Sequence, residues 1–354
     1  MFKISVILAI VISIYYIISA RKSILRKDTS KNYDLKSLSV IIPARNEEFN
    51  ISKILNLLLQ QTIHLDEIII VNDNSTDNTE TIVREYIKSN KNIKLVNLKE
   101  EPPKGWVGKS WAIWNGVKNS KGDILIFFDA DVEPEKNAIE VLLKKYNEGL
   151  LTVWPYQRFE KFYEHLSLAA NIITVYGSNA FGFLKSKPSG AFGPVMVTSR
   201  EDYFSVGGHE SIKDSVLEDT KLGKLYISKG KRVKNYLGNG IIKFRMYPKG
   251  IKQLFEGHTK NMASGSISGG ILYLILDFIW MVGIYSSIFS PSIKTYPVFI
   301  VLIYLLSRRL GDYKWYDYLF YPVHFIFFLI IFAVSLVETT FIKKVVWKGR
   351  KISV

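Results

Sequence analysis

Two hydrophobic patterns divide the chain. Residues 37–155 alternate short apolar runs with amphipathic stretches such as 51–59, which has helical periodicity. The apolar runs predict buried strands at 38–42, 67–71, 93–96 and 124–128. Because strands that alternate with helices form a parallel sheet, we expect an α/β, Rossmann-like domain over 37–240. Ligands of such sheets bind beyond the carboxyl ends of the strands.

The second pattern consists of long apolar segments. Residues 4–20 carry no charge and are long enough to span a bilayer. A cleaved signal peptide is the alternative, but Arg21 and Lys22 follow Ala20 directly and no small-x-small site is evident. We therefore expect a transmembrane anchor over 1–22.

Further apolar segments lie toward the end of the chain. We expect an interfacial helix within 241–266, transmembrane helices within 267–340 and a basic tail over 341–354. Segments 267–293 and 318–337 suit spans, whereas 295–307 is short and contains Pro297. Three spans would put the basic tail outside, and two would leave Arg308 and Arg309 outside. We favour two spans, with the tail inside.

The net charge of +15 would suit nucleic-acid binding if it covered the 37–240 domain. Instead, basic residues flank the apolar segments: Arg21, Lys22, Arg26, Lys27, Lys343, Lys344, Lys348, Arg350 and Lys351. This placement is typical of positive-inside anchoring on anionic lipid. We expect a multi-pass protein of the cytoplasmic membrane, with its domain facing the cytoplasm and no nucleic-acid partner. The absence of cysteine excludes disulfides, thiol catalysis and Cys-based zinc sites.

The strongest chemical signal is Asp129-Ala130-Asp131, at the end of the buried run 124–128. Two carboxylates at positions i and i+2 can hold a hard cation such as Mg²⁺ or Mn²⁺, which shares its ligands with substrate phosphates. A solvated turn is the alternative for an isolated Asp-x-Asp. We predict that Asp129 and Asp131 bind metal and that Asp129 also contacts the ligand's phosphates.

Polar residues follow the run 67–71 as well. We assign Asp73 to a ligand, because a carboxylate can accept hydrogen bonds from a base or ribose. Asp77 and Glu80 are spaced as a capping pair for a helix through Ile87. Asn, Ser and Asp also form turns for purely structural reasons.

A third polar stretch, 42–48, follows the first predicted strand, which Pro43 is expected to end. Arg45 is a candidate for phosphate and Glu47 for ribose hydroxyls. A charged loop that starts a helix is the alternative. Pro43 and Ala44 belong to the same predicted binding stretch.

The segment Lys104-Gly105-Trp106-Val107-Gly108-Lys109-Ser110 is a loop flanked by glycines. Glycines allow close backbone approach to a ligand, and a lysine such as Lys109 neutralises phosphate. The Walker spacing is absent, so this loop is not a P-loop.

Glu218-Asp219 follows a Gly-rich stretch and is suited to general base catalysis. Asp219 is our predicted base, and Glu218 and His209 are its rivals. An acceptor that is already a carboxylate needs less help from a base. Alternatively, the two acids cap the following helix.

Together, Pro43–Glu47, Asn72–Asp77, Asp129–Asp131 and Glu218-Asp219, in this order, resemble the motifs of membrane-bound family 2 glycosyltransferases. The resemblance covers roughly residues 37–265 and implies a GT-A nucleotide-sugar fold that uses a divalent metal. Gln253 begins the region that in many relatives reads Gln-x-x-Arg-Trp, and here the Arg-Trp pair is missing. This departure argues against a processive polysaccharide synthase.

Further motifs resemble the members of this family that glycosylate carotenoid acids: 105–110, 191–194, 201–203, 207–209, 244–247, 256–260 and 347–350. That resemblance implies an inverting transfer of glucose from UDP-glucose. It assigns Asp73 to uracil, Asp129 and Asp131 to the diphosphate and metal, and Asp219 to the acceptor. It also places five residues on the acceptor side, namely Gly193, Gly208, His209, Arg245 and His258.

The acceptor remains open at this point, because a carotenoid, a polyprenyl phosphate and a glycerolipid are all apolar with a polar end. A catalytically inactive, nucleotide-binding membrane scaffold is the alternative of another class. Such a scaffold would be marked by the loss of its metal carboxylates, and Asp129 and Asp131 are both present.

Overall fold

The computed structural model describes residues 2–27, 36–182, 188–215, 217–266, 270–289, 292, 294–338, 344–347 and 350–353. The chain divides into two units. The sheet unit contains Leu25–Pro155 and Ala191–Phe244. The helical unit contains Met1–Ile24, Tyr156–Gly190 and Arg245–Val354. Residues 156–190, which lie within the predicted 37–240 domain, therefore belong to the helical unit.

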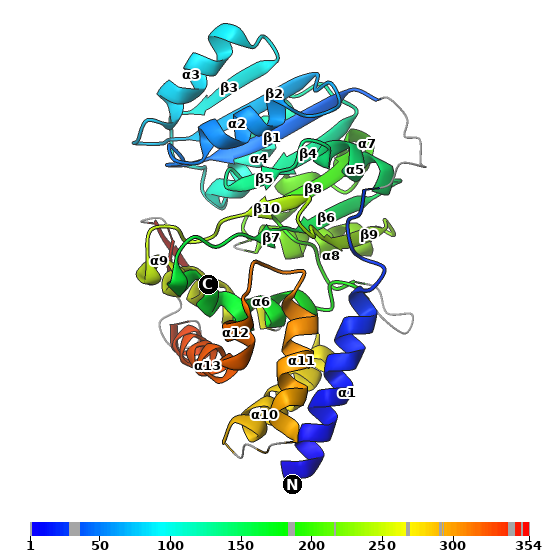
Figure 1. Ribbon diagram of the computed structural model, residues 1–354. Helices are drawn as coiled ribbons and strands as arrows, with labels where there is room; N and C mark the ends of the chain where they lie inside the picture. Colours follow the sequence, from blue (N-terminus) through cyan, green and yellow to red (C-terminus); the bar gives the residue numbers. More distant parts are fainter. Residues whose placement is uncertain are drawn as a thin grey trace. The chain divides into compact units, whose positions relative to one another are not determined.

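The sheet unit is built on a seven-stranded sheet, labelled in Figure 1. Its strands follow the order β3 (Ile93–Leu98), β2 (Glu67–Asp73), β1 (Leu38–Ala44), β4 (Ile124–Phe128), β8 (Val195–Ser199), β6 (Leu150–Trp154) and β9 (Val233–Leu237). Only β8 runs antiparallel to its neighbours, β4 and β6. The other neighbouring pairs are parallel, which confirms the predicted mostly parallel sheet.

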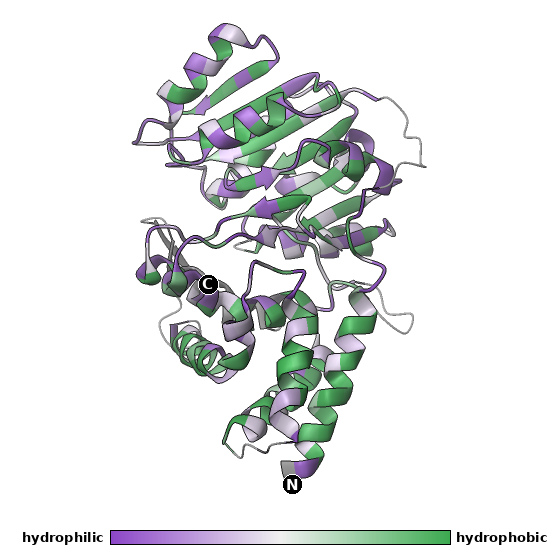
Figure 2. Ribbon diagram, viewed as in Figure 1, coloured by the Kyte–Doolittle hydropathy of each residue, from purple (hydrophilic) through white to green (hydrophobic). Residues whose placement is uncertain are grey.

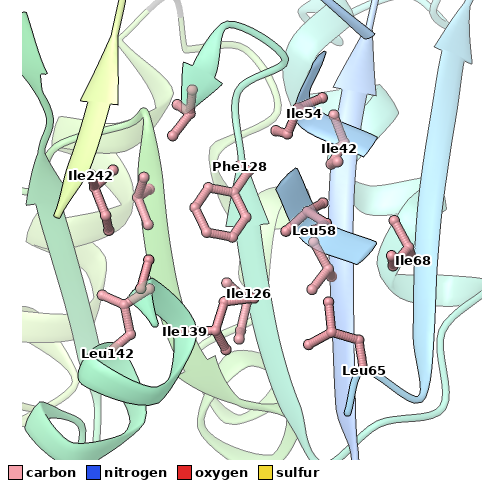
Figure 3. Close-up of a cluster of buried hydrophobic side chains, with 14 of the residues drawn as sticks. Ile42, Ile54, Leu58, Leu65, Ile68, Ile126, Phe128, Ile139, Leu142 and Ile242 are labelled. Carbon is pink, nitrogen blue, oxygen red and sulfur yellow. The ribbon is translucent and has the colours of Figure 1, made fainter. Parts of the chain in front are cut away.

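Both faces of the sheet are buried because successive side chains of a strand point to opposite faces. Ile42 and Ile126 pack with residues of α2 (Ile51–Leu59), α3 (Thr79–Ser89) and α5 (Ala138–Lys145), as Figure 3 shows for part of this cluster. Ile41 and Phe127 point the other way, against α4 (Gly108–Lys118), α7 (Arg200–Ser205) and α8 (Glu218–Ser228). Strands buried on two faces read as continuous apolar runs, which explains the sequence pattern.

The four predicted strands are confirmed, and β1, β2 and β3 each continue two residues further than predicted. β1 continues through Pro43 to Ala44 instead of ending at the proline. Pro43 is in register with Val71 of β2, whereas the register with β4 ends at Ile41. Pairing on one side only is the situation in which a strand tolerates proline.

The predicted capping pair is half correct. The Thr79 backbone N–H, in the first turn of α3, donates to Asp77 Oδ1 at 3.0 Å, so Asp77 does cap the helix. Glu80 does not reach back to the helix start but accepts from Arg84 Nε at 2.8 Å and from Asn97 Nδ2 at 2.9 Å. A reciprocal capping box is therefore absent.

The α-helices described in the helical unit have strongly or partly apolar faces, coloured by hydropathy in Figure 2. Their bounds are α1 (Phe2–Ala20), α6 (Leu168–Ile172), α9 (Ile251–Ser266), α10 (Ile271–Phe289), α11 (Thr295–Ser307) and α13 (Tyr321–Val337), with the short α12 (Trp315–Leu319) before the last. The turns η1 (Phe162–Ser167) and η2 (Ile173–Gly177) flank α6. α1 packs along α10 and α11.

Within the described residues, two helices are long and apolar enough to cross a membrane, Lys3–Ala20 and Ile271–Phe289. α11 and α13 are apolar but shorter. The predicted span 318–337 thus divides between α12 and α13. In the tail, β11 (Lys344–Trp347) pairs with β12 (Arg350–Ser353), and the rest of the 341–354 prediction lies outside the described residues.

Candidate active site

The site begins where β4 ends. The Asp129 backbone N–H donates to the Pro194 carbonyl at 2.9 Å, and the Val132 N–H donates to the Asp129 carbonyl at 3.1 Å. These bonds fix the turn Asp129–Asp131 at the carboxyl end of the sheet and tie it to the stretch before β8. Asp129 and Asp131 are both half-buried.

Lys109, in the first turn of α4, joins the Asp-Ala-Asp turn to the start of α8. Its ammonium lies 2.8 Å from Asp129 Oδ1 and 2.9 Å from Glu218 Oε1. It also donates to Asp129 Oδ2 at 3.1 Å. Burial alone would lower the pKa of Lys109. The negative charges of Asp129 and Glu218 together have the larger, opposite effect, so the pKa of Lys109 is well above its ordinary value. Lys109 is therefore positively charged at physiological pH.

Asp219 follows Glu218 and is the third acid of this cluster. Its Oδ1 accepts the Thr220 backbone N–H at 2.7 Å at the start of α8. Burial and the negative charge of Glu218 raise the pKa of Asp219 to about 6, against the opposing effect of Lys109. A carboxyl group with this pKa is well matched to proton transfer near neutral pH. Both acids lie in the first turn of α8, where negative charge is favourable, but the N-cap residue is Leu217 and it makes no side-chain capping bond.

Gly193 lies against Asp219. A β-carbon at Gly193 would be 2.8 Å from Asp219 Oδ2, closer than side-chain atoms tolerate. The predicted acceptor-side glycine is thus in direct contact with the predicted base.

The carboxylates at the end of β4 suit a hard divalent cation. Asp129 and Asp131 would supply two oxygen ligands from one turn, and Mg²⁺ and Mn²⁺ prefer such ligands. No group of three or more His, Cys, Asp or Glu residues that could hold a metal occurs in the described part of the chain. A pair of carboxylates leaves most coordination positions to water and substrate phosphates, which is the usual arrangement for Mg²⁺ at phosphate-binding sites.

The other predicted donor-binding residues, among them Arg45, Glu47 and Asp73, lie at or just after the ends of β1 and β2. Asp73 is only 5% exposed. Arg45 Nη1 donates to the Asp73 carbonyl at 3.0 Å and lies 3.9 Å from Asp73 Oδ2. Arg45 therefore has Asp73 as an anionic neighbour, and a phosphate would be a second one. The Asn50 amide donates to Glu47 Oε2 at 2.8 Å, and the Glu47 N–H donates to Thr79 Oγ1 at 2.9 Å.

His209 and Gly208 are placed in the core rather than on a surface. His209 is 0% exposed and contacts the Tyr203 hydroxyl through Nδ1 at 2.9 Å and through its backbone N–H at 3.0 Å. Gly208 has φ +50°, and a β-carbon there would lie 2.4 Å from the Tyr203 ring. Burial lowers the pKa of His209 to about 4, so it is neutral at physiological pH. Full burial argues against His209 as the rival base and against its direct contact with an acceptor.

Arg245 and His258 belong to the helical unit. Arg245 Nη2 and Nε pair with the buried Glu164 at 2.7 and 3.0 Å, and Nη1 lies 2.6 Å from Glu160. His258 Nε2 is 3.2 Å from Ser167 Oγ. The contacts of Arg245 and His258 given above all join residues of the helical unit. They do not support the predicted acceptor-side roles of these two residues.

Sequence reasoning missed Tyr203 and Pro194. Tyr203 supports His209 and packs on Phe127 with ring centroids 5.9 Å apart, and the Pro194 carbonyl holds Asp129. Both lie inside stretches quoted for the family resemblance, but nothing in the local pattern indicates which core contact each one makes.

A mostly parallel sheet with paired carboxylates at its carboxyl edge, next to a lysine and an acidic pair, is the arrangement expected of a GT-A glycosyltransferase. The glycosyl transferase family 2 model matches residues 39–203, and the chain belongs to this family. It is similar to 4,4'-diaponeurosporenoate glycosyltransferase of Staphylococcus aureus (strain N315), with 35% identity over 350 residues that cover 93% of this chain and 91% of that protein. The same enzyme of strain MRSA252 is 34% identical. The chain is accordingly a glycosyltransferase.

A solved structure supports the fold. The mannosyltransferase PcManGT from Pyrobaculum calidifontis, in complex with GDP-Man and Mn²⁺, matches with a TM-score of 0.59 at 15% identity, over 97% of this chain and 99% of that chain. At this level of identity the match establishes the GT-A fold of the present chain and nothing finer.

Proposed function

We propose that this glycosyltransferase moves glucose from UDP-glucose, with inversion, onto an apolar acceptor that ends in a carboxylate, such as a carotenoid acid. The similarity to the diaponeurosporenoate enzyme over most of both chains supports this substrate class. The observation that carries the proposal is the cluster of Asp129, Lys109, Glu218 and Asp219, which places an acid of raised pKa beside a lysine and the Asp-Ala-Asp turn.

In the proposed reaction, an acceptor oxygen forms a bond to the anomeric carbon from the face opposite the diphosphate. The bond from that carbon to the phosphate oxygen breaks, and its electron pair leaves with UDP. A carboxylate acceptor has no proton to lose. A hydroxyl acceptor would transfer its proton to Asp219, whose carboxylate form is the base.

The remaining residues would bind and orient the donor. Asp73 would accept a hydrogen bond from uracil, Glu47 would contact the ribose hydroxyls, and Lys109 would neutralise the diphosphate. Asp129 and Asp131 would hold Mn²⁺ or Mg²⁺, which when bound stabilises the negative charge of the leaving diphosphate.

We further propose that α1 and α10 span the cytoplasmic membrane. One side of α1 is an apolar stripe with exposed fractions between 47% and 64%. The stripe, whose members recur every three or four residues, consists of Ile4, Ile7, Val11, Ile14 and Ile18. In water this apolar stripe would be exposed at a cost in free energy, whereas the hydrocarbon of a lipid bilayer would cover it.

The opposite side of α1 is bonded to α10. Trp280 Nε1 donates to Ser13 Oγ at 2.9 Å, and the Tyr16 hydroxyl donates to Asp277 Oδ1 at 2.5 Å. Asp277, the one acid of α10, is thus satisfied within the helix pair, as intramembrane acids require. These bonds support a retained anchor rather than a cleaved signal. The basic residues that follow α1 support a cytoplasmic sheet unit.

The experiment is a donor and acceptor panel. Purified full-length protein in detergent, with Mn²⁺, is supplied with UDP- and GDP-sugars and with long-chain carboxylic acids, alcohols and monophosphates that share one polyene chain. We expect a glucosyl ester from UDP-glucose and the carboxylic acid. A product formed only with the monophosphate would instead identify a polyprenyl-phosphate glycosyltransferase, and nucleotide binding without any product would identify an inactive scaffold.

A further inference from the structure

We propose that Lys109 competes with a divalent cation for Asp129, so that the cation binds this site together with a nucleoside diphosphate and not before it. This inference rests on the proposed function for the nature of the ligand. It adds an order of binding and assigns the cause of that order to one side chain.

The first reason is geometric. The Lys109 ammonium contacts both oxygens of Asp129, at 2.8 and 3.1 Å, and therefore lies on the open side of that carboxylate. Mg²⁺ would bind the same lone pairs at about 2.0–2.1 Å. Two cations cannot share these oxygens at such short range without strong mutual repulsion.

The second reason is that Lys109 forms ion pairs with two carboxylates. Its ammonium is also 2.9 Å from Glu218 Oε1, and Glu218 is buried at the start of α8. Displacing the ammonium into solvent would leave that buried carboxylate without this ion pair, which is costly. A cation alone must therefore offset the loss of two ion pairs to reach Asp129.

A diphosphate changes this balance. Its oxygens offer the ammonium a new anionic partner, and the lysine has a flexible four-carbon stem that can follow them. They also supply the ligands that Asp129 and Asp131 do not provide, since no third His, Cys, Asp or Glu joins them in the described residues. The cation and the nucleotide then stabilise each other's binding, as linkage requires.

The test measures Mn²⁺ binding by electron paramagnetic resonance, with no sugar donor present. Full-length wild type and the variants Lys109→Met and Lys109→Arg are titrated with Mn²⁺ alone, with UDP and with GDP. Asp131→Ala defines binding elsewhere on the protein. Lys118→Met removes an exposed lysine at the other end of α4 and serves as the matched control.

We expect wild type, Lys118→Met and Lys109→Arg to bind Mn²⁺ at least tenfold more tightly with a nucleotide than without it. In Lys109→Met, the affinity for Mn²⁺ alone should rise at least tenfold, and the effect of the nucleotide should shrink. An unchanged or weaker affinity for Mn²⁺ alone in folded Lys109→Met would overturn the inference. So would wild type that binds Mn²⁺ alone as tightly as with either nucleotide, a result that needs no variant.

The two proposals fail separately. If no donor yields product but Lys109→Met still binds Mn²⁺ alone more tightly, the proposed function is wrong and the competition stands. If glucose transfer proceeds as proposed and Lys109→Met shows no gain, only the competition is wrong.

Discussion

Gly193 leaves room for the carboxylate of Asp219, because a β-carbon at this glycine would lie only 2.8 Å from Asp219 Oδ2. A methyl group there must displace the acid or shift the backbone before β8. We predict that Gly193→Ala lowers kcat/KM for a long-chain alcohol acceptor, which needs Asp219 as base, at least tenfold while the protein stays folded. Steady-state kinetics and a thermal melt check this prediction.

The control for this prediction is a double-mutant cycle. In an Asp219→Ala background, Gly193→Ala should have little further effect, because the group that it displaces is already absent. If the loss of activity in the double variant equals the product of the losses in the two single variants, Gly193 acts through something other than Asp219.

Asp219→Asn should separate acceptor types. If Asp219 removes a proton, its loss should slow transfer to a long-chain alcohol by about 10²–10⁴-fold, the usual contribution of a general base. Transfer to the matching carboxylic acid, which is already ionised at neutral pH, should fall far less. Rates with the two acceptors, measured on the same preparation, decide this. Equal losses would contradict a role in proton removal.

Four strands of the sheet were predictable because each is a continuous apolar run closed by polar residues. β6, β8 and β9 were not predicted. β8 pairs with β4 across a long stretch of chain, with Ser199 in register with Ile124, and such partners leave no periodic trace in the local sequence. The antiparallel direction of β8 within an otherwise parallel sheet is therefore set by long-range contacts and not by the local sequence.

The site was predictable as residue types but not as contacts. Lys109 was assigned to phosphate and Glu218 was a rival base, and their 2.9 Å ion pair depends on how α4 and α8 pack. Arg45 was likewise assigned to phosphate, without its contact to the Asp73 carbonyl. His209 was a rival base next to two glycines, and the local sequence did not show that these left-handed glycines fold it into the core.

His209 should make stability depend on pH. Its pKa is lowered to about 4 by burial, whereas an unfolded chain has a histidine pKa near 6.5. Above pH 6.5 both states are neutral and the full stability is present. As pH falls from 6.5 toward 4, the unfolded state gains the proton first, so the free energy of unfolding decreases by about 1.4 kcal/mol per pH unit.

The check compares wild type with His209→Gln in urea denaturation at pH 6.5 and pH 5. Wild type should lose about 2 kcal/mol more than the variant over this interval. The variant retains every other titrating group, including His258, so the difference isolates His209. Identical pH dependence in the two proteins would mean that this imidazole is not held neutral.

The apolar stripe of α1 should be needed for insertion into the membrane. Val11, at the middle of α1, is 57% exposed, and arginine at the centre of a spanning helix costs about 2.5–3.5 kcal/mol on insertion scales. Val11→Arg should raise the fraction extracted by alkaline carbonate. Phe49→Arg alters a residue of the sheet unit that is 74% exposed and should have no such effect. Equal extraction of the two variants would argue against α1 as a span.

The most direct test of the central claim is UDP release from UDP-glucose in the presence of Mn²⁺ and a long-chain carboxylic acid, by wild type and by Asp131→Ala. The account predicts that wild type releases UDP as the ester forms, that EDTA stops the release and Mn²⁺ restores it, and that Asp131→Ala is at least about 100-fold slower. Full activity of Asp131→Ala, or indifference of wild type to EDTA, would contradict the assignment of this turn to a metal and a diphosphate.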